Sequence, residues 1–195
     1  MRVYLAGPDV FCPAPLVRAA SLKVVCARHG LAGVSPLDPL DDEPAPWRAL
    51  PEARRIALRN EAHIRGCDAL IANLTPFRGP SADAGTVFEI GFMRALGRPV
   101  FGWSNVAADF LTRTRAFVGV AVAAEGGWRD GEGMLLEAFG TQDNLMIDAA
   151  VLASGGALFA ADIPAASRWT DISTFERCVM ALARLERDRL TPTGQ

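Results

Sequence analysis

The fold follows from residues 67–103, which read CDALIANLTPFRGPSADAGTVFEIGFMRALGRPVFGW. Residues 68–74 form a short apolar run with an acidic residue at its entry, and this predicts a buried strand. A glycine- and proline-rich loop follows, and then a helix is predicted over residues 86–96, ended by Gly97 and Pro99. Residues 100–103 predict another strand. Strand, helix and strand in this order are typical of a parallel sheet, because parallel neighbours need a crossover connection.

The same alternation extends toward the N-terminus. Residues 2–6 and 31–35 predict strands, and residues 16–27 and 52–66 predict helices. The acidic, proline-rich residues 36–51 are predicted to be loop. The order β-α-β-α-β-α-β therefore predicts an α/β fold with a doubly wound (flavodoxin- or Rossmann-like) parallel sheet flanked by helices.

The C-terminal half has a less regular pattern. Residues 104–142 are predicted to form an irregular insertion or mobile lid, with a helix near 107–115 and a glycine-rich stretch at 126–133. The pattern predicts a helix over 135–153, interrupted or started afresh near Gly140, a last strand at 156–161 and a final helix at 173–189. The TPTGQ tail is predicted to fray. The length of 195 residues suits one domain, so we expect residues 1–195 to form a single unit around a five-stranded sheet.

The composition excludes several classes of function. The 20 basic side chains nearly balance the 22 acidic ones, and a net charge of −2 argues against a nucleic-acid-binding or membrane-surface protein. Schiff-base chemistry would have to use Lys23, the one lysine, and two histidines cannot build a histidine-rich metal site. No apolar run approaches the length of a membrane span. The four cysteines are widely spaced without a CxxC pair, so we expect a cytoplasmic protein with reduced thiols.

Two loops are expected at the edge of the sheet where ligands bind. In an open parallel sheet this edge is formed by the carboxyl ends of the strands, close to the point where the winding direction reverses. The first strand delivers Gly7 there, and the strand at 68–74 delivers the loop 75–85. Glycine permits close approach of the backbone, which makes Gly7 a candidate substrate contact. LAGPDVF is not a GxGxxG motif, so a dinucleotide site has little support, and the absence of GxxxxGK[ST] excludes a P-loop.

Two carboxylates in residues 81–91, SADAGTVFEIG, are candidates for catalysis. Asp83 precedes the predicted helix, and Glu89 lies one to two turns inside it. The helix N-terminus favours an ionised Glu89, whereas apolar neighbours raise the pKa of a carboxyl, and the sequence does not decide between these effects. Two carboxyls in different environments are what retaining glycosyl transfer requires. The alternatives are a helix cap for Asp83 and a solvated helix face for Glu89.

Three segments resemble the nucleoside 2-deoxyribosyltransferase family, and in particular its protozoan-type branch. They are YLAGPDVF at residues 4–11, CDALIANLTPFRGPSADAGTVFEIG at 67–91 and DNLM at 143–146. The similarity is strongest over residues 1–100 and returns at 140–155. The chain departs from the compact form of the family at residues 104–142, and this departure leaves the lid and the base specificity open.

The resemblance implies a role for each of five residues. Glu89 would be the nucleophile that attacks C1′ of a 2′-deoxynucleoside, and Asp83 would protonate the departing base and deprotonate the incoming one. Tyr4 would hydrogen-bond to the nucleophile and orient it, and Phe11 would pack on the base. Asp68 would lie at the strand entrance or the pocket wall, where it would bind the base or steady its neighbours. Without the resemblance, Tyr4 and Phe11 have core positions as their alternatives, and Asp68 has a structural role at a strand end.

The resemblance also implies a site shared between subunits of a homo-oligomer. Asn144 and Met146 would reach into the pocket of a neighbouring subunit, with Asn144 near the sugar 5′-hydroxyl. Nucleosides and nucleobases would be the only partners besides the neighbouring subunit, and no cofactor or metal is expected. A helix cap is the alternative for Asn144, and a core position is the alternative for Met146.

The expected function is exchange of the base of 2′-deoxynucleosides by retaining double displacement, in nucleoside salvage. One alternative is an N-glycosidase of the same superfamily that hydrolyses nucleoside 5′-monophosphates. Against it, the first loop, GPDVF, is not rich in serine and glycine, and Asp9 would repel a nearby phosphate. The other alternative is a non-catalytic nucleotide-sensing module. The preference for purines or pyrimidines, the tolerance for a 2′-hydroxyl, the oligomer size and the balance of transfer and hydrolysis stay open.

Overall fold

A five-stranded sheet forms the centre of the protein. The structure, a computed structural model, describes residues 1–190, and the prediction that the TPTGQ tail frays falls outside these residues. The sheet is parallel throughout, and its strand order is β2-β1-β3-β4-β7. This is the flavodoxin-like order, so the predicted fold class is confirmed. The strands are β1 (Arg2–Ala6), β2 (Ala32–Val34), β3 (Ala69–Asn73), β4 (Val100–Ser104) and β7 (Leu158–Ala160).

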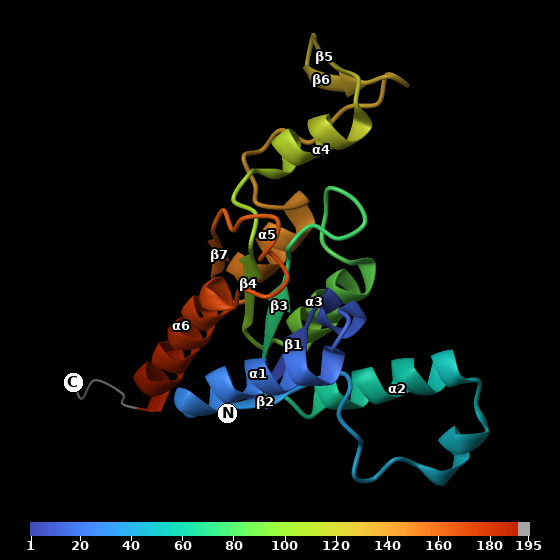
Figure 1. Cartoon of the computed structure of the whole chain (residues 1–195), viewed down its shortest axis with the longest axis vertical. Coiled ribbons are helices and arrows are strands. Elements are labelled where there is room, and N and C mark those ends of the chain that lie inside the picture. The colour runs from blue at the N-terminus through green and yellow to red at the C-terminus, as the bar shows by residue number, and fades with distance from the viewer. Residues whose placement is uncertain (191–195) are drawn as a thin grey trace.

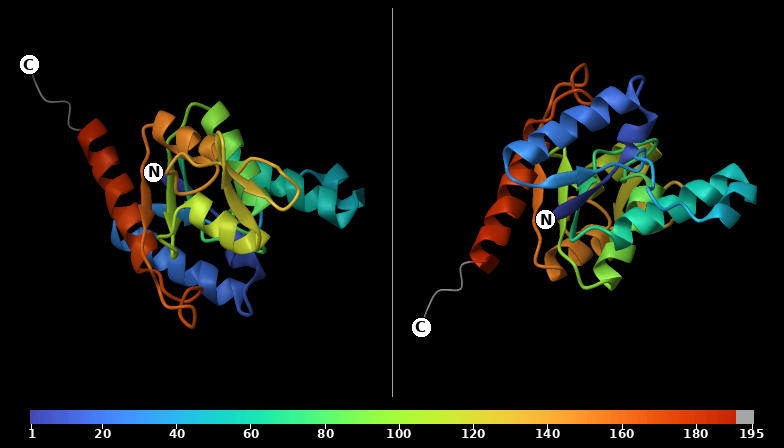
Figure 2. Two further views of the ribbon diagram at one scale, coloured as in Figure 1. Left: turned by 90° about the horizontal axis from the view of Figure 1, so that it is seen from above. Right: turned by 90° about the horizontal axis from the view of Figure 1, so that it is seen from below.

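Helices cover both faces of this sheet (Figure 2). On one face lie α1 (Pro15–Arg28) and α6 (Ser173–Leu190), and the core of the other face is closed by α2 (Glu52–Arg65), α3 (Ala84–Ala95) and α5 (Leu145–Ala153). Successive side chains of a strand point to opposite faces. Val3 and Leu5 of β1 therefore pack with α1 and α6, whereas Tyr4 and Ala6 pack on the side of α3.

The local sequence explains why these elements form where they do. All five residues of β3 are buried, as expected of a central strand that is covered on both faces. Helix α3 begins after Asp83, whose carboxylate accepts a hydrogen bond from the amide of Thr86 and so caps the helix. Helix α1 begins with Pro15, which has no amide hydrogen to leave unpaired in the first turn.

The predicted insertion is an ordered arm that projects from the sheet (Figure 1). It contains α4 (Phe110–Val118) and an antiparallel hairpin of β5 (Ala121–Ala124) and β6 (Gly127–Asp130). Gly126 has a φ of 83° and completes the turn between the two strands. The insertion and its helix are therefore confirmed, whereas residues 121–130, for which no strand was predicted, form a hairpin and so correct the expectation of an irregular segment there.

Two further boundaries differ from the prediction. Helix α5 begins only at Leu145, because residues 134–136 instead hydrogen-bond to β6 and Asn144 caps the helix. Residues 36–51, predicted to be loop, contain a short 3-10 helix, η2 (Ala45–Ala49), and a second one, η1 (Pro8–Phe11), follows β1. Each of these short helices has a proline among its first two positions, where a missing amide hydrogen has no cost.

Helix α6 offers a test of the packing. Leu182 is fully buried against the sheet, whereas Met180 on the same helix is 53% exposed. We expect Leu182→Ala to lower the free energy of unfolding by about 2–5 kcal/mol, since it removes buried atoms and leaves a cavity. The control Met180→Ala should change this free energy by less than about 1 kcal/mol. Urea unfolding measures both, and equal losses would contradict this orientation of α6.

Candidate active site

A cavity of about 340 Å³ opens at the carboxyl ends of β1 and β3. Its volume lies within the range of small-molecule sites in proteins. It also lies where the strand order reverses, because the chain passes from β1 outward to β2 and then returns to β3 on the other side of β1. The lining residues come from the loop after β1, the loop after β2, helix α2 and the start of α3; they are Gly7, Val10, Phe11, Pro36, Leu37, Ile56, Asn60, Asp83, Gly85, Thr86 and Glu89.

Gly7 lets the backbone turn sharply beside the cavity. Its φ is 155°, and a Cβ at this position would come within 2.7 Å of both Asn73 Cβ and Asp9 Oδ2. Any side chain would therefore displace the loop, so close packing against Asn73 and Asp9 requires glycine here, and the substrate contact of Gly7 stays a prediction. Asp9 is itself fixed, because its carboxylate accepts from Arg18 Nε at 2.7 Å and from Asn73 Nδ2 at 2.8 Å.

Tyr4 and Glu89 meet below the cavity. The Tyr4 hydroxyl donates a hydrogen bond to Glu89 Oε1 at 2.6 Å, and both side chains are buried. The strand alternation turns Tyr4 toward α3, and α3 carries Glu89 on its sheet-facing side, next to Ile90 and Met93 of the core. The structure thus brings together a carboxylate and a hydroxyl that lie 85 residues apart in the chain.

Burial, and not the helix terminus, controls the ionisation of Glu89. Burial raises the pKa of its carboxyl to about 7; the hydrogen bond from Tyr4 lowers this pKa, and the charge of Asp83 raises it. The sequence left this balance open. The helix dipole has little influence because its effect falls off within the first turn, and Glu89 lies beyond it. Burial and the neighbouring Glu89 also raise the pKa of the Tyr4 hydroxyl, which keeps it a proton donor.

Asp83 is the second carboxylate of the cavity. Its Oδ2 accepts from the amide of Thr86 at 3.1 Å and from the Thr86 hydroxyl at 3.2 Å. The helix cap that was the alternative for Asp83 is therefore present, and Asp83 also lines the cavity together with Glu89. Both hydrogen bonds use Oδ2, so the cap and a cavity-facing role are compatible.

Phe11 forms part of the cavity wall at its mouth. Its ring is 57% exposed and stacks on Phe77, with the ring centroids 5.4 Å apart. The guanidinium of Arg78 lies 5.2 Å from the Phe11 ring and 4.6 Å from the Phe77 ring. An exposed aromatic face is thus held in place beside the two carboxylates.

Three predicted site residues lie away from this cavity. Asp68 precedes β3 and accepts from the amide of Arg2 at 2.7 Å, so it lies at the strand entrance, where it holds a neighbouring strand, and not at the wall of this cavity. Asn144 caps α5, where its side chain accepts from the amide of Met146 and donates to Glu137. The Met146 side chain is 69% exposed, in contrast to the core position that was its alternative.

Asn60 is a cavity residue that the sequence did not single out. It lies on α2, and its amide oxygen is buried without a hydrogen-bond partner. A buried polar atom without a partner is costly, so this oxygen marks a position where a ligand donor would be favoured. Ile56 lines the cavity one helical turn earlier, and this spacing of four residues was the available signal.

Within residues 1–190, no three histidine, cysteine, aspartate or glutamate side chains are grouped so that they could hold a metal ion. In that same part of the chain, no helix combines the length and the apolar character needed to cross a membrane.

Comparison with known proteins assigns the chain to a family. The family described as Nucleoside 2-deoxyribosyltransferase matches residues 3–146, a span that includes Tyr4, Asp83 and Glu89. The chain belongs to the nucleoside 2-deoxyribosyltransferase family. The resemblance in the sequence motifs is thereby confirmed, and the departure at residues 104–142 is an arm within a family member.

Relatives of this nucleoside 2-deoxyribosyltransferase-family chain include proteins known from sequence and from structure. An uncharacterized protein of Schizosaccharomyces pombe is 30% identical over 167 residues, which cover 79% of this chain and 78% of that protein. The solved structure of a 2-desoxiribosyltransferase from Leishmania mexicana has a TM-score of 0.56 and 28% identity, over 75% of this chain and 84% of that one. A conserved protein from Enterococcus faecalis V583, at 22% identity and a TM-score of 0.50 over 83% of this chain and 92% of that one, shares the fold.

The buried Glu89 should make the stability of this family member depend on pH. Its pKa rises from an ordinary value of 4.5 to about 7 in the folded state, so the folded state binds the proton more tightly than the unfolded one. The resulting stabilisation is complete below about pH 4.5 and is lost as the pH rises through about 7. We expect Glu89→Gln, which cannot ionise, to gain up to about 3 kcal/mol over the wild type between about pH 5 and pH 8.

Urea unfolding over that pH range measures this gain. Glu125→Gln is the control, because Glu125 lies in the exposed turn of the hairpin and should give no such gain. If the free energies of unfolding of Glu89→Gln and the wild type differ by the same amount at every pH, then Glu89 ionises in the folded protein as it does in water.

Proposed function

We propose that this chain exchanges the base of 2′-deoxynucleosides by retaining double displacement through a covalent deoxyribosyl–Glu89 intermediate, in cytoplasmic nucleoside salvage. The observation that carries the proposal is the buried Tyr4–Glu89 hydrogen bond at a cavity that also contains Asp83. Family membership supports an enzyme that handles pentosyl groups. The Leishmania mexicana relative is itself described as a 2-desoxiribosyltransferase.

The first displacement forms the covalent intermediate. Since Oε1 of Glu89 accepts from Tyr4, Oε2 is the oxygen that attacks C1′ of the sugar. The bond between C1′ and the base nitrogen breaks, its electron pair stays on the base, and protonated Asp83 supplies the proton that the base needs. With a pKa of about 7, roughly half of Glu89 is ionised near neutral pH and can act as the nucleophile.

The second displacement reverses the roles. A ring nitrogen of the incoming base attacks C1′, and its proton passes to the Asp83 carboxylate. The bond between C1′ and Glu89 breaks, and the electron pair returns to the carboxylate, where the Tyr4 hydroxyl stabilises the charge. Two inversions at C1′ retain the configuration of the sugar.

The base would be held by an apolar wall and one amide. Phe11 offers its exposed ring face for packing, and Ile56 and Leu37 supply apolar surface. The partnerless amide oxygen of Asn60 accepts hydrogen bonds only, so it fits an N–H donor of the base. Gly7 brings the backbone next to the sugar and base.

The 5′ end of the sugar would be met by a neighbouring subunit. Met146 is exposed and Asn144 lies beside it at the start of α5, so both are accessible to a second copy of the chain. The Asn144 amide already donates to Glu137, so it must share or exchange this contact to bind a 5′-hydroxyl. The assembly would then be a homo-oligomer whose subunits complete each other's sites.

The charge near the cavity bears on the N-glycosidase alternative. Asp9 was expected to repel a phosphate, but Arg18 and Asn73 hold its carboxylate, and Asp9 does not line the cavity. The expected discrimination against nucleoside monophosphates therefore rests less on Asp9 than the sequence indicated.

A base-exchange assay tests the proposal directly. Incubation with 2′-deoxyinosine and adenine should give 2′-deoxyadenosine and hypoxanthine, and Glu89→Ala should lower the rate on the order of 10³-fold or more. Consumption of 2′-deoxyinosine at the same rate without adenine, giving free deoxyribose, would identify a hydrolase. Faster consumption of the 5′-monophosphate would favour the N-glycosidase alternative specifically.

A trapped intermediate tests the role of Glu89. A 2′-deoxynucleoside fluorinated at the 2-position of the sugar should slow turnover of the intermediate, so mass spectrometry should find the sugar attached to a peptide containing Glu89. Glu89→Gln serves as the control, since it removes the nucleophile and should form no adduct. Ligand binding that survives in Glu89→Ala, together with no adduct in the wild type, would favour the nucleotide-sensing alternative.

The Tyr4–Glu89 hydrogen bond should affect both rate and pH dependence. Tyr4→Phe removes a donor to a charged group, so we expect kcat to fall by about tenfold to a hundredfold with little change in KM. Because this bond lowers the pKa of Glu89, its loss should move the rising limb of the pH–rate profile to higher pH. Thermal unfolding provides the control for folding. An unchanged rate and profile would make Tyr4 a core residue only.

A further inference from the structure

A second buried carboxylate, Asp143, lies outside the cavity. It is fully buried, and its partners come from the loop that precedes α3, from α4 and from the start of α5. Its oxygens accept from the Ser81 hydroxyl, from the amide of Ala82 at 3.0 Å, from Arg113 Nη2 at 3.1 Å and from the amide of Asn144 at 2.8 Å. Four donors therefore fix this one side chain.

Arg113 reaches the same place from the base of the arm. It belongs to α4, and its side chain is buried. Nε donates to the carbonyl of Pro80 at 2.7 Å, Nη1 to the carbonyl of Ala108 at 2.8 Å, and Nη2 to Asp143. All three guanidinium nitrogens thus have acceptors, and one of these acceptors is the backbone of the loop before α3.

These contacts converge on the residues that immediately precede Asp83. Pro80, Ser81 and Ala82 each bond to Arg113 or Asp143. The following residue is Asp83, whose Oδ2 caps Thr86 and whose side chain lines the cavity. The backbone that carries Asp83 into the site is therefore held by an ion pair that does not line the cavity.

The energetics of the ion pair favour a positional effect over a gain in stability. Removing two charges from water is costly, and the attraction between them typically does little more than offset that cost. A fully paired buried ion pair does fix geometry, because any other arrangement leaves a charge without partners. Here the geometry that it fixes is the entry of the chain into α3.

We propose that Arg113 and Asp143 are positioning residues that orient Asp83 for proton transfer to the nucleobase. The end of the arm that contains Arg113 would then support the site. The proposal rests on the proposed function, in which Asp83 exchanges a proton with the base. It assigns no contact with substrate to either residue, and both act through residues 80–82.

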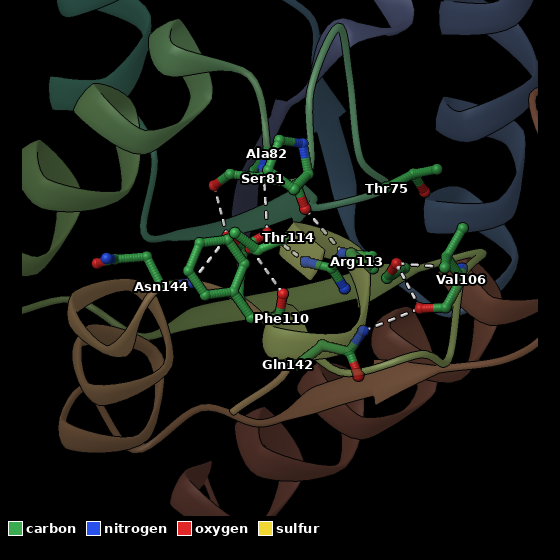
Figure 3. Close-up of polar contacts among 12 residues, drawn as sticks. Thr75, Ser81, Ala82, Val106, Phe110, Arg113, Thr114, Gln142 and Asn144 are labelled. Carbon is green, nitrogen blue, oxygen red and sulfur yellow. Dashed lines mark hydrogen bonds and ion pairs between the residues drawn. The ribbon is translucent and has the colours of Figure 1, made fainter. Parts of the chain in front are cut away.

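Two variants disturb this support without removing a buried charge. Ser81→Ala deletes one donor to Asp143, and Arg113→Lys keeps the positive charge but cannot reach all three acceptors. Thr114→Ala is the matched control, because Thr114 lies next to Arg113 on α4 and its hydroxyl donates only to the carbonyl of Phe110 within the same helix (Figure 3).

Two substrates separate loss of proton transfer from general damage. The base of 2′-deoxyinosine needs a proton to leave, whereas the cationic base of 7-methyl-2′-deoxyguanosine leaves as a neutral molecule without one. Single-turnover release of the base, measured without an acceptor base, isolates the first displacement. We expect Ser81→Ala and Arg113→Lys to lower the rate of base release from 2′-deoxyinosine about tenfold, with the substrate concentration at half-maximal rate within about twofold, because misplacement of a proton donor slows the chemical step. Their rates of base release from 7-methyl-2′-deoxyguanosine and both rates of Thr114→Ala should match the wild type. Equal losses on both substrates, or no loss on either, would overturn the proposal.

Amide hydrogen exchange supplies a readout that needs no turnover. The Thr86 amide bonds to Asp83 Oδ2, so its protection reports the position of that carboxylate. In Arg113→Lys its exchange should quicken about fivefold or more, and in Thr114→Ala it should not change. If the wild type transfers and hydrolyses neither substrate, the proposed function fails, while exchange still decides whether Arg113 holds Asp83. Unchanged protection of Thr86 in Arg113→Lys overturns the positioning role whatever the activity.

Discussion

A carboxylate that is removed from water must find hydrogen-bond donors or take up a proton. Glu89 lies between these two outcomes, since burial raises its pKa while the Tyr4 hydroxyl stabilises its charge. The Tyr4–Glu89 hydrogen bond forms because β1 packs against α3. This packing in turn depends on the position of β1 beside β3 in the sheet. The turn at Gly7 and the cap at Asp83 then bring the two adjacent loops to the rim of the same cavity.

Much of this arrangement could be predicted from local patterns. Each central strand is an apolar run, and each crossover is a helix of ordinary length, so the parallel sheet and its ligand-binding edge follow. Asp83 and Glu89 could be grouped for this reason, whereas Tyr4 joined them only through the resemblance to the family. Asp68 does not belong to this group, because it precedes β3 and lies at the amino ends of the strands. The five residues of β3 separate it from the carboxyl-end edge by about 17 Å.

The features that were missed depend on partners far apart in the chain. Asp143 meets Ser81 across 62 residues, and no periodicity signals such a pair. The hairpin of the arm was hidden because each strand has only four residues: β5 reads AVAA, without alternation of apolar and polar residues, and β6 reads GWRD. Asn60 is a polar residue on an amphipathic helix, and only the way α2 meets the edge of the sheet distinguishes it from a solvated side chain.

The attachment of the arm has a consequence for how this family member can diverge. The hairpin of β5 and β6 lies at the far end of α4, away from the sheet (Figure 1), whereas the buried charges that join the arm to the rest of the protein sit at its root. No residue of this hairpin lines the cavity or belongs to the Arg113–Asp143 ion pair. A change confined to β5 and β6 therefore leaves the contacts that hold residues 80–82 in place, whereas a change at the α4 end of the arm removes them.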